Sequence, residues 1–373
     1  MNRPLTVGIM SYRNRSGLAP FSEGGYFRQL IRSARSLGLR AFVFCPLDID
    51  WVGRRIYGYS FSPEKGSWYA KYYAFPDVVY DRLFPGGAIS GMLFGAANRL
   101  RKQRNIVFFG RALRGKWEVY RSLYKYPDLS PHIPDTIPLT GTTVLGSMIK
   151  KHGYLYIKPD AGSQGKGIVQ VRAQRDGYSC RGRDHLNRSF STHVQTLTAV
   201  LNLARNVSHR RRLLVQQGLY LNHFRGSTFD IRTIVQKNEE GQWEVTGTAA
   251  RVGRRGSITS NLHGGGTALR TEALLKQQFP DRYQQILEKI NWLGVNIPTA
   301  LDKELGRFGE FGLDLGVDKD GHVWLIEANS KPGRTVFLRI RAYDLRRASV
   351  LRPMQYSKFL ALQRRSRGEA SNA

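Results

Sequence analysis

Two acids and an amide near the C-terminus have the types and the spacing to act together: Asp314, Glu327 and Asn329. They flank Asp320-Gly321, a dipeptide typical of a two-residue type I′ hairpin turn, in which both central residues take a positive φ. A turn at that point places Asp314 directly opposite Glu327, and facing Cβ atoms in a sheet lie about 4.5–5.5 Å apart. Asn329 lies two residues further along and shares the face of Glu327.

Two like charges in facing positions destabilise a sheet, so a compensating cation is expected between them. Carboxylate and amide oxygens are hard ligands that suit Mg²⁺, or Mn²⁺, shared with phosphate groups. We therefore expect Asp314, Glu327 and Asn329 to hold such a metal. The alternative is a half-exposed hairpin with ordinary surface acids, because antiparallel strands often alternate apolar and polar residues.

The other face of the same hairpin is apolar and is expected to pack on a core. Its members are Leu313, Leu315, Val317, Trp324, Ile326 and Ala328. Gly312 and Gly316 lie on the face of Asp314 and leave it open for a bulky ligand.

A second pattern is a lysine followed by a glycine-rich loop. Residues 154–158 are predicted as a strand ending in Lys158, and Gly162, Gly165 and Gly167 precede a second strand at 168–172. Backbone N–H groups in such a loop can converge on phosphate oxygens. It is not a Walker loop, since no Gly-Lys-Ser/Thr opens a helix, and not a dinucleotide fingerprint, since a strand follows it. It fits a flap between two antiparallel strands, and an ordinary glycine-rich hairpin is the alternative.

Two arginines lie on or beside predicted strands. In the strand predicted at 229–236, Arg232 shares a face with Asp230, which indicates either a surface ion pair worth about 0–1 kcal/mol or a cation directed at phosphate. Arg251 follows the next predicted strand. The polar, glycine-dense loop beyond it contains His263, a candidate site residue that has no partner carboxylate nearby in the sequence.

The composition indicates a folded protein with a strong attraction for anions. The 373 residues suit two or three domains, and 58 basic against 28 acidic residues give a net charge of +30. Such a charge attracts nucleotide phosphates, acidic peptides or nucleic acid. The densest stretch, 331–367, holds eleven Lys or Arg and one acid, Asp344. It could be a nucleic-acid patch, or a solvated surface that contacts an acidic partner.

Neither a secretory segment nor a membrane span is expected. The sequence has no run of about eighteen apolar residues, and its first ten residues lack the apolar core and cleavage site of a signal peptide. Its two cysteines, Cys45 and Cys180, are too few for a disulfide framework or a cysteine-rich zinc site, which fits the reducing cytoplasm.

The first hundred residues alternate strands and helices, as expected for a mainly parallel sheet. Strands are predicted at 5–10, 40–45, 76–82 and 105–109, with a helix between a cap at Ser22 and a stop at Gly38, and another at 92–104. Further along, we predict helices at 116–124, about 143–151 and 192–206, strands at 213–217, 229–236 and 243–250, and a mobile loop at 176–188.

These pieces together resemble the ATP-grasp superfamily, and more closely the YheC/YheD family of endospore-coat-associated ATP-grasp proteins. The matching segments are 45–49, 76–82, 115–117, 215–218, 229–232 and 260–263, the last of which is also similar to RimK-type glutamate ligases. The resemblance implies an α/β (α+β) fold in which an N-terminal α/β domain (1–110) precedes an ATP-grasp domain (111–352). The small lobe would span about 140–218, and 353–373 would form a basic C-terminal helix or tail.

The resemblance also implies a role for each matching position. Lys116 and Lys158 would be the two nucleotide-binding lysines. The flap over the triphosphate would consist of Gly162, Ser163, Gln164, Gly165 and Gly167. The hinge that contacts adenine would include Gln216, Gln217 and Leu219, although the family often has an acid where this chain has Gln217. Arg232 and Arg251 would contact phosphates and developing charge, and Asp314, Glu327 and Asn329 would hold Mg²⁺, with Asn329 also contacting the nucleotide.

The function implied is that of an ATP- and Mg²⁺-dependent carboxylate–amine ligase. It would form an acylphosphate on an amino-acid or peptide substrate, and the basic surface suggests an acidic one. We find no Gly-x-Ser-x-Gly elbow and no supported Cys/His pair, and such a mechanism requires neither. Two alternatives stay open: a catalytically silent ATP-binding component of the spore coat, and a basic nucleic-acid-binding protein. Association with the endospore coat and its proteins follows only from the resemblance, whereas the expected location in the cytoplasm rests on the cysteine content.

Overall fold

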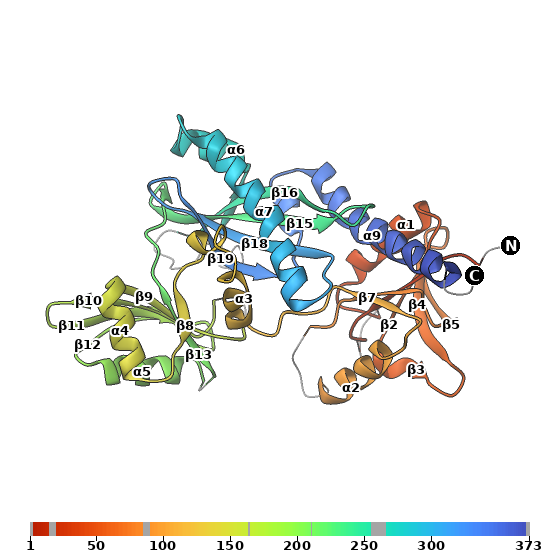
Figure 1. Ribbon diagram of the computed structural model, residues 1–373, viewed down its shortest axis with the longest axis horizontal. Helices are drawn as coiled ribbons and strands as arrows, with labels where there is room; N and C mark the ends of the chain where they lie inside the picture. Colours follow the sequence, from red (N-terminus) through yellow and green to blue (C-terminus); the bar gives the residue numbers. More distant parts are fainter. Residues whose placement is uncertain are drawn as a thin grey trace.

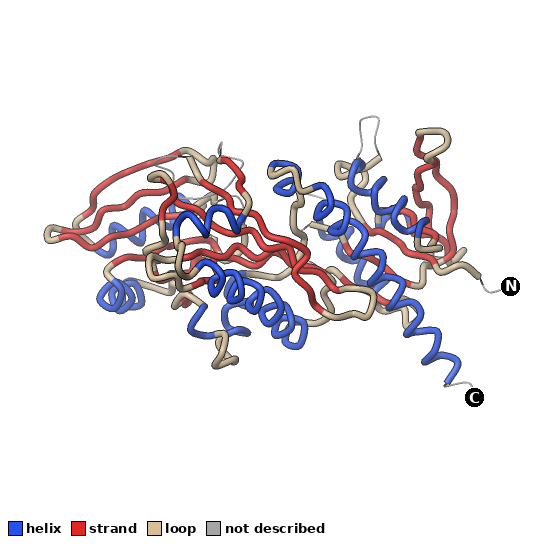
Figure 2. Tube along the Cα trace, turned by 90° about the horizontal axis from the view of Figure 1, so that it is seen from above, coloured by secondary structure: helices blue, strands red, loops and turns tan. Residues whose placement is uncertain are grey.

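Three β-sheets lie along the long axis of the molecule (Figure 1). The central sheet contains the hairpin of Asp314 and Glu327, called the acid hairpin below, and the other two sheets lie on either side of it. The computed structural model describes residues 3–14, 20–84, 90–162, 165–209, 211–254 and 266–370. Seen from above, both chain ends lie at the same end of the molecule, beside the N-terminal sheet (Figure 2). None of the described helices is both long enough and apolar enough to cross a membrane.

The N-terminal sheet has the order β3-β4-β2-β1-β6-β7, with β5 paired to β4. Its strands are β1 (Thr6–Met10), β2 (Arg40–Phe44), β3 (Ile49–Asp50), β4 (Arg55–Ser62), β5 (Ser67–Ala74), β6 (Val78–Asp81) and β7 (Val107–Phe109). The predicted parallel pairing is confirmed for β1 with β2 and β6, and for β6 with β7. The antiparallel β4–β5 hairpin was not predicted.

Helices cover both faces of this sheet. Helix α1 (Gly24–Ser36) and the C-terminal helix α9 (Tyr343–Ala370) share one apolar cluster with it, and α2 (Ser90–Arg101) covers the other face. Glu23, not the predicted Ser22, directly precedes α1, and no side chain caps its first turn.

The small-lobe sheet is antiparallel, with the order β12-β11-β10-β9-β13-β8. Its strands are β8 (Thr136–Pro138), β9 (Tyr154–Pro159), β10 (Ile168–Gln174), β11 (Gly177–Arg183), β12 (Ser189–Val194) and β13 (Leu213–Gln217). Helices α4 (Thr142–His152) and α5 (Leu197–Val207) pack on one face.

Two predictions for this lobe were wrong. The segment 176–188 is not a mobile loop, because most of it forms β11, which pairs on both sides. The helix predicted at 192–206 starts five residues later, because residues up to Val194 belong to β12. Both strands are largely polar, and Cys180 is the one fully buried apolar side chain of β11, so the apolar alternation that would reveal a strand is weak.

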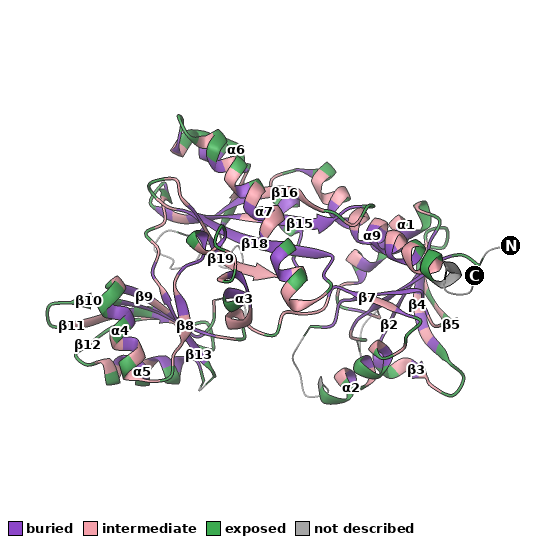
Figure 3. Ribbon diagram, in the orientation of Figure 1, coloured by how far each residue is buried: buried purple, intermediate pink, exposed green. Residues whose placement is uncertain are grey.

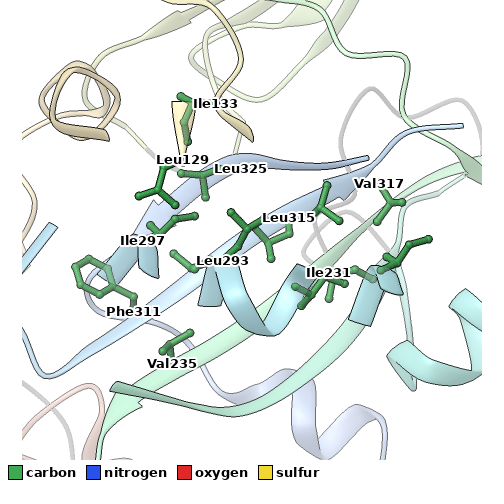
Figure 4. Close-up of a cluster of buried hydrophobic side chains, with 14 of the residues drawn as sticks. Leu129, Ile133, Ile231, Val235, Leu293, Ile297, Phe311, Leu315, Val317 and Leu325 are labelled. Carbon is green, nitrogen blue, oxygen red and sulfur yellow. The ribbon is translucent and has the colours of Figure 1, made fainter. Parts of the chain in front are cut away.

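The central sheet has the order β17-β16-β15-β18-β19, with β14 paired to β15. Its strands are β14 (His223–Phe224), β15 (Ser227–Lys237), β16 (Trp243–Val252), β17 (Thr267–Leu269), β18 (Glu310–Val317) and β19 (Val323–Asn329). Helices α3 (Lys116–Leu123), α6 (Thr271–Gln278) and α7 (Tyr283–Leu305) share one apolar cluster with it, and α8 (Thr335–Arg339) packs on the other face. Figure 4 shows Leu293 and Ile297 of α7 against Leu315 and Phe311 of the sheet. Strand β18 is buried along its whole length (Figure 3).

The turn of the acid hairpin differs from the prediction. Beyond the two strands, Asp318 and His322 are still paired through a backbone hydrogen bond of 3.0 Å, so the loop consists of residues 319–321. Of these three, only Gly321 has a positive φ, of 80°. Asp318 explains the longer loop, because its Oδ1 accepts the N–H groups of Asp320 and His322, 3.0 and 2.9 Å away. An aspartate that binds the backbone two residues on is a standard turn former.

The facing pair is nevertheless confirmed, because a second irregularity compensates for the first. The three-residue loop offsets the register by one residue, and a bulge between Asp314 and Leu315 restores it, so Asp314 lies opposite Glu327. Between turn and bulge, Val323 and Leu325 enter the core. The prediction that Trp324 and Ile326 face the core was therefore wrong.

Helix α9 contains Pro353, which removes one backbone donor from the helix. The carbonyl oxygen of Ser349, four residues earlier, instead accepts hydrogen bonds from Gln236 Nε2 (2.9 Å) and Arg334 Nε (3.0 Å). The helix therefore continues through the boundary predicted at 353 and is fixed to the central sheet at that position.

Candidate functional site

A cavity of about 790 Å³ lies between the central sheet, the small lobe and the N-terminal sheet. Twelve of its 27 lining residues are charged, and the basic ones outnumber the acidic ones by eight to four. The basic residues are Arg82, Arg114, Lys116, Arg211, Arg232, Arg251, Lys331 and Arg339, and the acidic residues are Glu23, Asp160, Asp314 and Glu327.

Asp314 is held between two arginines by the order of the strands. Arg232 faces it across β15 and β18, and donates from Nε (2.6 Å) and Nη2 (3.1 Å) to its two oxygens. Arg251 Nη2 lies 2.9 Å from Asp314 Oδ2. Arg251 also donates from Nε and Nη2 to the two oxygens of Asp230, its own facing residue on β15, both at 2.6 Å. Asp230 and Arg232 are thus not an exposed ion pair, since each pairs across the sheet.

Burial and charge act in opposite directions on this cluster. Burial alone would raise the pKa of Asp314, but the guanidinium groups of Arg232 and Arg251 outweigh burial and lower it. Burial alone would lower the pKa of Arg251, but Asp314 and Asp230 raise it well above its ordinary value. Asp314 is therefore an ionised carboxylate at neutral pH, although only 5 % of it is exposed.

Lys116 connects the second acid to the glycine-rich loop. Its Nζ lies 3.1 Å from Glu327 Oε1 and donates to the carbonyl oxygen of Gly162 (2.8 Å). Lys116 is the first residue of α3, and Asp160 binds the start of that helix through the amide N–H of Trp117 (2.8 Å). Gly115 permits this close approach, because a Cβ there would lie 2.8 Å from Asp160 Oδ1.

Lys158 is buried next to this cavity without a carboxylate partner among the described residues. Its Nζ donates to Tyr120 Oη (2.9 Å) and Gln216 Oε1 (2.8 Å), and Gln216 Nε2 donates in turn to Thr136 Oγ1 (2.6 Å). Burial, together with the positive charge of Lys116, lowers the pKa of Lys158 to about 7, although Glu327 opposes this. A lysine that readily gains or loses its proton near neutral pH is unusual and is typical of a binding site.

Tyr120 lines the cavity, and its hydroxyl lies between Lys158 and β19. The hydroxyl donates to the carbonyl oxygen of Ile326 (2.7 Å) and accepts from Lys158. This residue was not predicted from the sequence. The available signal was its position one helical turn after Lys116 on α3.

Comparisons with known proteins agree with this geometry. Residues 105–360 match the model of the YheC/D like ATP-grasp family, which is more than half of the chain. The chain belongs to this YheC/D-like ATP-grasp family. Endospore coat-associated protein YheC of Bacillus subtilis (strain 168) is 28 % identical over 341 residues, which cover 90 % of this chain and 91 % of that protein. YheD of the same strain is 30 % identical over 349 residues, covering 92 % and 75 %.

Solved structures show the same fold at low sequence identity. The ATP-grasp ligase PsnB, in a complex with a precursor variant, Mg and ADP, has a TM-score of 0.52 at 13 % identity, covering 94 % of this chain and all of that one. D-alanyl-alanine synthetase A from Vibrio cholerae O1 biovar eltor str. N16961 has a TM-score of 0.53 at 11 % identity, covering 96 % and 99 %. The protein therefore has the ATP-grasp fold, as predicted.

The YheC/D-like chain has donor atoms that fit a divalent cation. Asp314 Oδ2 accepts from both arginines but Oδ1 accepts from only one, which leaves Oδ1 a lone pair. Within the described residues, Glu327 Oε2 and the Asn329 side chain have no hydrogen-bond partner, and both residues line the cavity. No group of three or more His, Cys, Asp or Glu in the described ranges is arranged for a metal. Amide and ligand oxygens would therefore complete the shell, as Mg²⁺ commonly requires.

The structure brings together some of the predicted site residues but not all. The cavity is lined by Lys116, Gly162, Arg232, Arg251, Asp314, Glu327 and Asn329. The predicted residues outside its lining are Lys158, Gly165, Gly167, Gln216, Gln217 and Leu219. Ser163, Gln164 and His263 lie outside the described residues. Gln217 is engaged elsewhere, since its Oε1 accepts the amide N–H of Asp135 (3.2 Å).

The wall of the cavity on the N-terminal sheet was not predicted from the sequence. Arg82, directly after β6, donates from Nη2 to Glu23 Oε1 (2.7 Å) and from Nη1 to Glu310 Oε1 (3.2 Å). Glu310, at the start of β18, also accepts from Tyr80 and Arg334. This buried network joins the N-terminal sheet to the strand that carries Asp314. Tyr80 and Arg82 lie 230 and 228 residues from Glu310 in sequence, so no local pattern reveals these two contacts.

Proposed function

We propose that this protein is an ATP- and Mg²⁺-dependent carboxylate–amine ligase. The observation that carries the proposal is the facing pair Asp314 and Glu327 in one cavity with Arg232, Arg251 and Lys116. Membership of the YheC/D-like family and the fold shared with ATP-grasp ligases support it. The names of the Bacillus subtilis relatives support an association with the endospore coat, which we propose for this chain as well.

The proposed roles follow from the contacts. Lys116 and Lys158, with the loop around Gly162, would bind the phosphates of ATP. Asp314, Glu327 and Asn329 would hold Mg²⁺, which when bound neutralises charge on the phosphates. The hinge residues Gln216, Gln217 and Leu219 would contact adenine. The flap residues Ser163, Gln164, Gly165 and Gly167 would cover the triphosphate.

The chain's own contribution to chemistry would be fixed positive charge. A substrate carboxylate would attack the γ-phosphate, and Arg232 and Arg251 would neutralise charge on the transferred phosphoryl group from positions already set by Asp314 and Asp230. An amine would then displace phosphate from the acylphosphate. Neither step requires a protein nucleophile.

The lining also favours an acidic substrate. Eight basic and four acidic side chains leave a clear positive excess. The complex of ATP with Mg²⁺ is a dianion at neutral pH and cancels only part of it. Arg114 and Arg211 have no ion pair or hydrogen bond among the described residues, and Arg339 has only one bond, to the carbonyl oxygen of Gly266 (3.2 Å). We therefore propose a carboxylate substrate with further negative charge, such as a glutamate-rich peptide.

The domain division belongs to this proposal. Residues 1–110 would supply the substrate-side wall, residues 111–352 the ATP-grasp core, and about 140–218 its small lobe. The basic end of α9, beyond 353, packs through Met354, Tyr356 and Leu360 on the N-terminal sheet.

The test is ADP release and hydroxamate formation with ATP, Mg²⁺, hydroxylamine and a panel of acidic carboxylates. We expect both products from the wild type, and a loss of about 10²-fold or more in Asp314→Asn and Glu327→Gln. Asp320→Asn, an exposed acid at the hairpin turn, is the matched control and should retain activity. Nucleotide binding without either product across the panel would contradict the ligase proposal and favour a silent coat component.

A further inference from the structure

The cavity has a second end, on the N-terminal sheet, that the proposed nucleotide and metal residues do not occupy. Glu23 precedes α1 and lines this end, together with Arg82 and Phe84, which follow β6. Phe84 is an exposed aromatic side chain, so this end presents an apolar surface beside its charges. A second substrate can lie here without displacing residues at the acid hairpin.

Glu23 differs from the other three acids of the cavity. Asp314 binds two arginines, Glu327 binds Lys116, and Asp160 binds the first turn of α3. Among the described residues, Glu23 accepts one bond, from Arg82 to its Oε1, while its Oε2 is shielded from water and has no hydrogen-bond partner there. A buried carboxylate oxygen without a donor is unfavourable and is uncommon in native structures.

Arg82 fixes Glu23 in place but does not satisfy it. The guanidinium group is almost fully buried and is shared with Glu310, which anchors it from the opposite side. The Glu23 side chain is 31 % exposed, and the last torsion of a glutamate is soft, so the carboxylate can turn its free oxygen toward the cavity. A positively charged donor group of small size fits this requirement.

We propose that Glu23 binds the ammonium group of the amine substrate. This group would lose one proton to Glu23 so that the neutral amine can attack the acylphosphate, and a second proton to the departing phosphate as the amide forms. The inference rests on the proposed ligase function, because a carboxylate–amine ligase must bind an amine in addition to ATP and a carboxylate. It assigns the N-terminal end of the cavity to a primary amine, such as the α-amino group of an amino acid or peptide. A primary ammonium group is a compact positive charge with three N–H donors, which suits a carboxylate that has one free oxygen.

Hydroxylamine separates this inference from the function on which it rests. Hydroxylamine is uncharged at neutral pH and traps the acylphosphate as a hydroxamate, whereas common L-amino acids present an ammonium group. Wild type and Glu23→Gln would each be incubated with ATP, Mg²⁺ and a glutamate-rich peptide. One sample would also contain hydroxylamine and the other an equimolar mixture of amino acids, and the products of both would be measured by mass spectrometry. We expect the ratio of amide to hydroxamate to fall at least about tenfold in Glu23→Gln, as for loss of a charge-assisted hydrogen bond.

Every outcome of this experiment decides the inference. An unchanged ratio overturns it while leaving the ligase proposal intact, and absence of hydroxamate from the wild type overturns both. Glu288→Gln, an exposed acid on α7, is the matched control and should keep the wild-type ratio. If Glu23→Gln does not fold, Glu23→Asp replaces it, and an unchanged KM for the amine in that variant counts against the inference.

Discussion

Lys158 should make nucleotide binding depend on pH above neutrality. Its pKa falls from an ordinary value near 10.5 to about 7, because the ammonium group is buried and lies near Lys116. This depression corresponds to about 5 kcal/mol in favour of the neutral amine. Between pH 7 and 10.5 the unfolded chain binds more protons than the folded chain at this residue, so the free protein gains stability as pH rises through that window.

Nucleotide binding should reverse the depression. A phosphate group near Lys158 Nζ favours the charged form, so the pKa in the complex lies above that in the free protein. Affinity for ATP is then greatest below pH 7 and is lost as pH rises through the pKa of the complex. With a free pKa of about 7, roughly 0.9 of a proton is taken up per ATP bound at pH 8, and Kd rises up to about tenfold per pH unit.

Titration calorimetry at pH 8 in buffers of different ionisation enthalpy measures this uptake directly. We expect nearly one proton for the wild type and for Lys150→Met, an exposed lysine of the same lobe. Lys158→Met should bind ATP more weakly below pH 7 and take up no proton. Uptake that persists in Lys158→Met, or that is absent from the wild type, would refute the assignment of Lys158 to the phosphates.

Three further substitutions test other parts of the site and its support. Glu327→Gln should weaken Mg²⁺-dependent ATP binding at least about tenfold, measured by titrating Mg²⁺ at constant ATP. Glu310→Gln should lower the free energy of unfolding by about 3–5 kcal/mol in urea, because two buried arginines lose their carboxylate partner. Gly312→Ala should cost about 1–3 kcal/mol and lower the thermal midpoint, because its Cβ would lie 2.7 Å from the Cβ of Pro332.

Each of these has an outcome that would contradict it. An unaltered Mg²⁺ dependence in Glu327→Gln would remove that residue from the metal site. The Glu310 argument fails if its variant unfolds at the same urea concentration as Glu64→Gln, an exposed acid. Gly25→Ala, where a Cβ meets nothing within 4 Å, is the control for added volume, and equal midpoints for the two alanine variants would refute the packing argument.

The sequence predicted the acid pair correctly through partly wrong steps. Alternation along the strands and the Asp-Gly turn indicated that Asp314 faces Glu327, and the register agrees. The turn itself was wrong, because Asp318 stabilises a three-residue loop, and only a compensating bulge restores the facing pair. Bulges depend on pairing along the whole strand, which a local dipeptide pattern does not describe.

The partners of the acids could not be predicted in the same way. Arg232 was expected beside Asp230, but it binds Asp314, 82 residues away, because β15 and β18 are neighbours in the sheet. Local spacing fixes which residues share a face, whereas strand order decides which faces meet. The same limit explains why Glu23 and Arg82 were missed, since they reach the site only when the N-terminal sheet packs on β18.

If the proposed function holds, the ion pairs of the cavity predict that metal and nucleotide would bind cooperatively. Asp314 and Glu327 are already neutralised by Arg232, Arg251 and Lys116, so phosphates arriving alone would compete with carboxylates for the same cations. Mg²⁺ arriving alone would likewise approach acids whose charge is already compensated. When both arrive, the carboxylates can turn to the metal and the cations to the phosphates, and the number of opposite charges in contact is conserved. The ion pairs of the free protein therefore favour the complex that contains both Mg²⁺ and nucleotide over a complex that contains only one of them. Thermodynamic linkage then requires each ligand to raise the affinity of the other by the same factor.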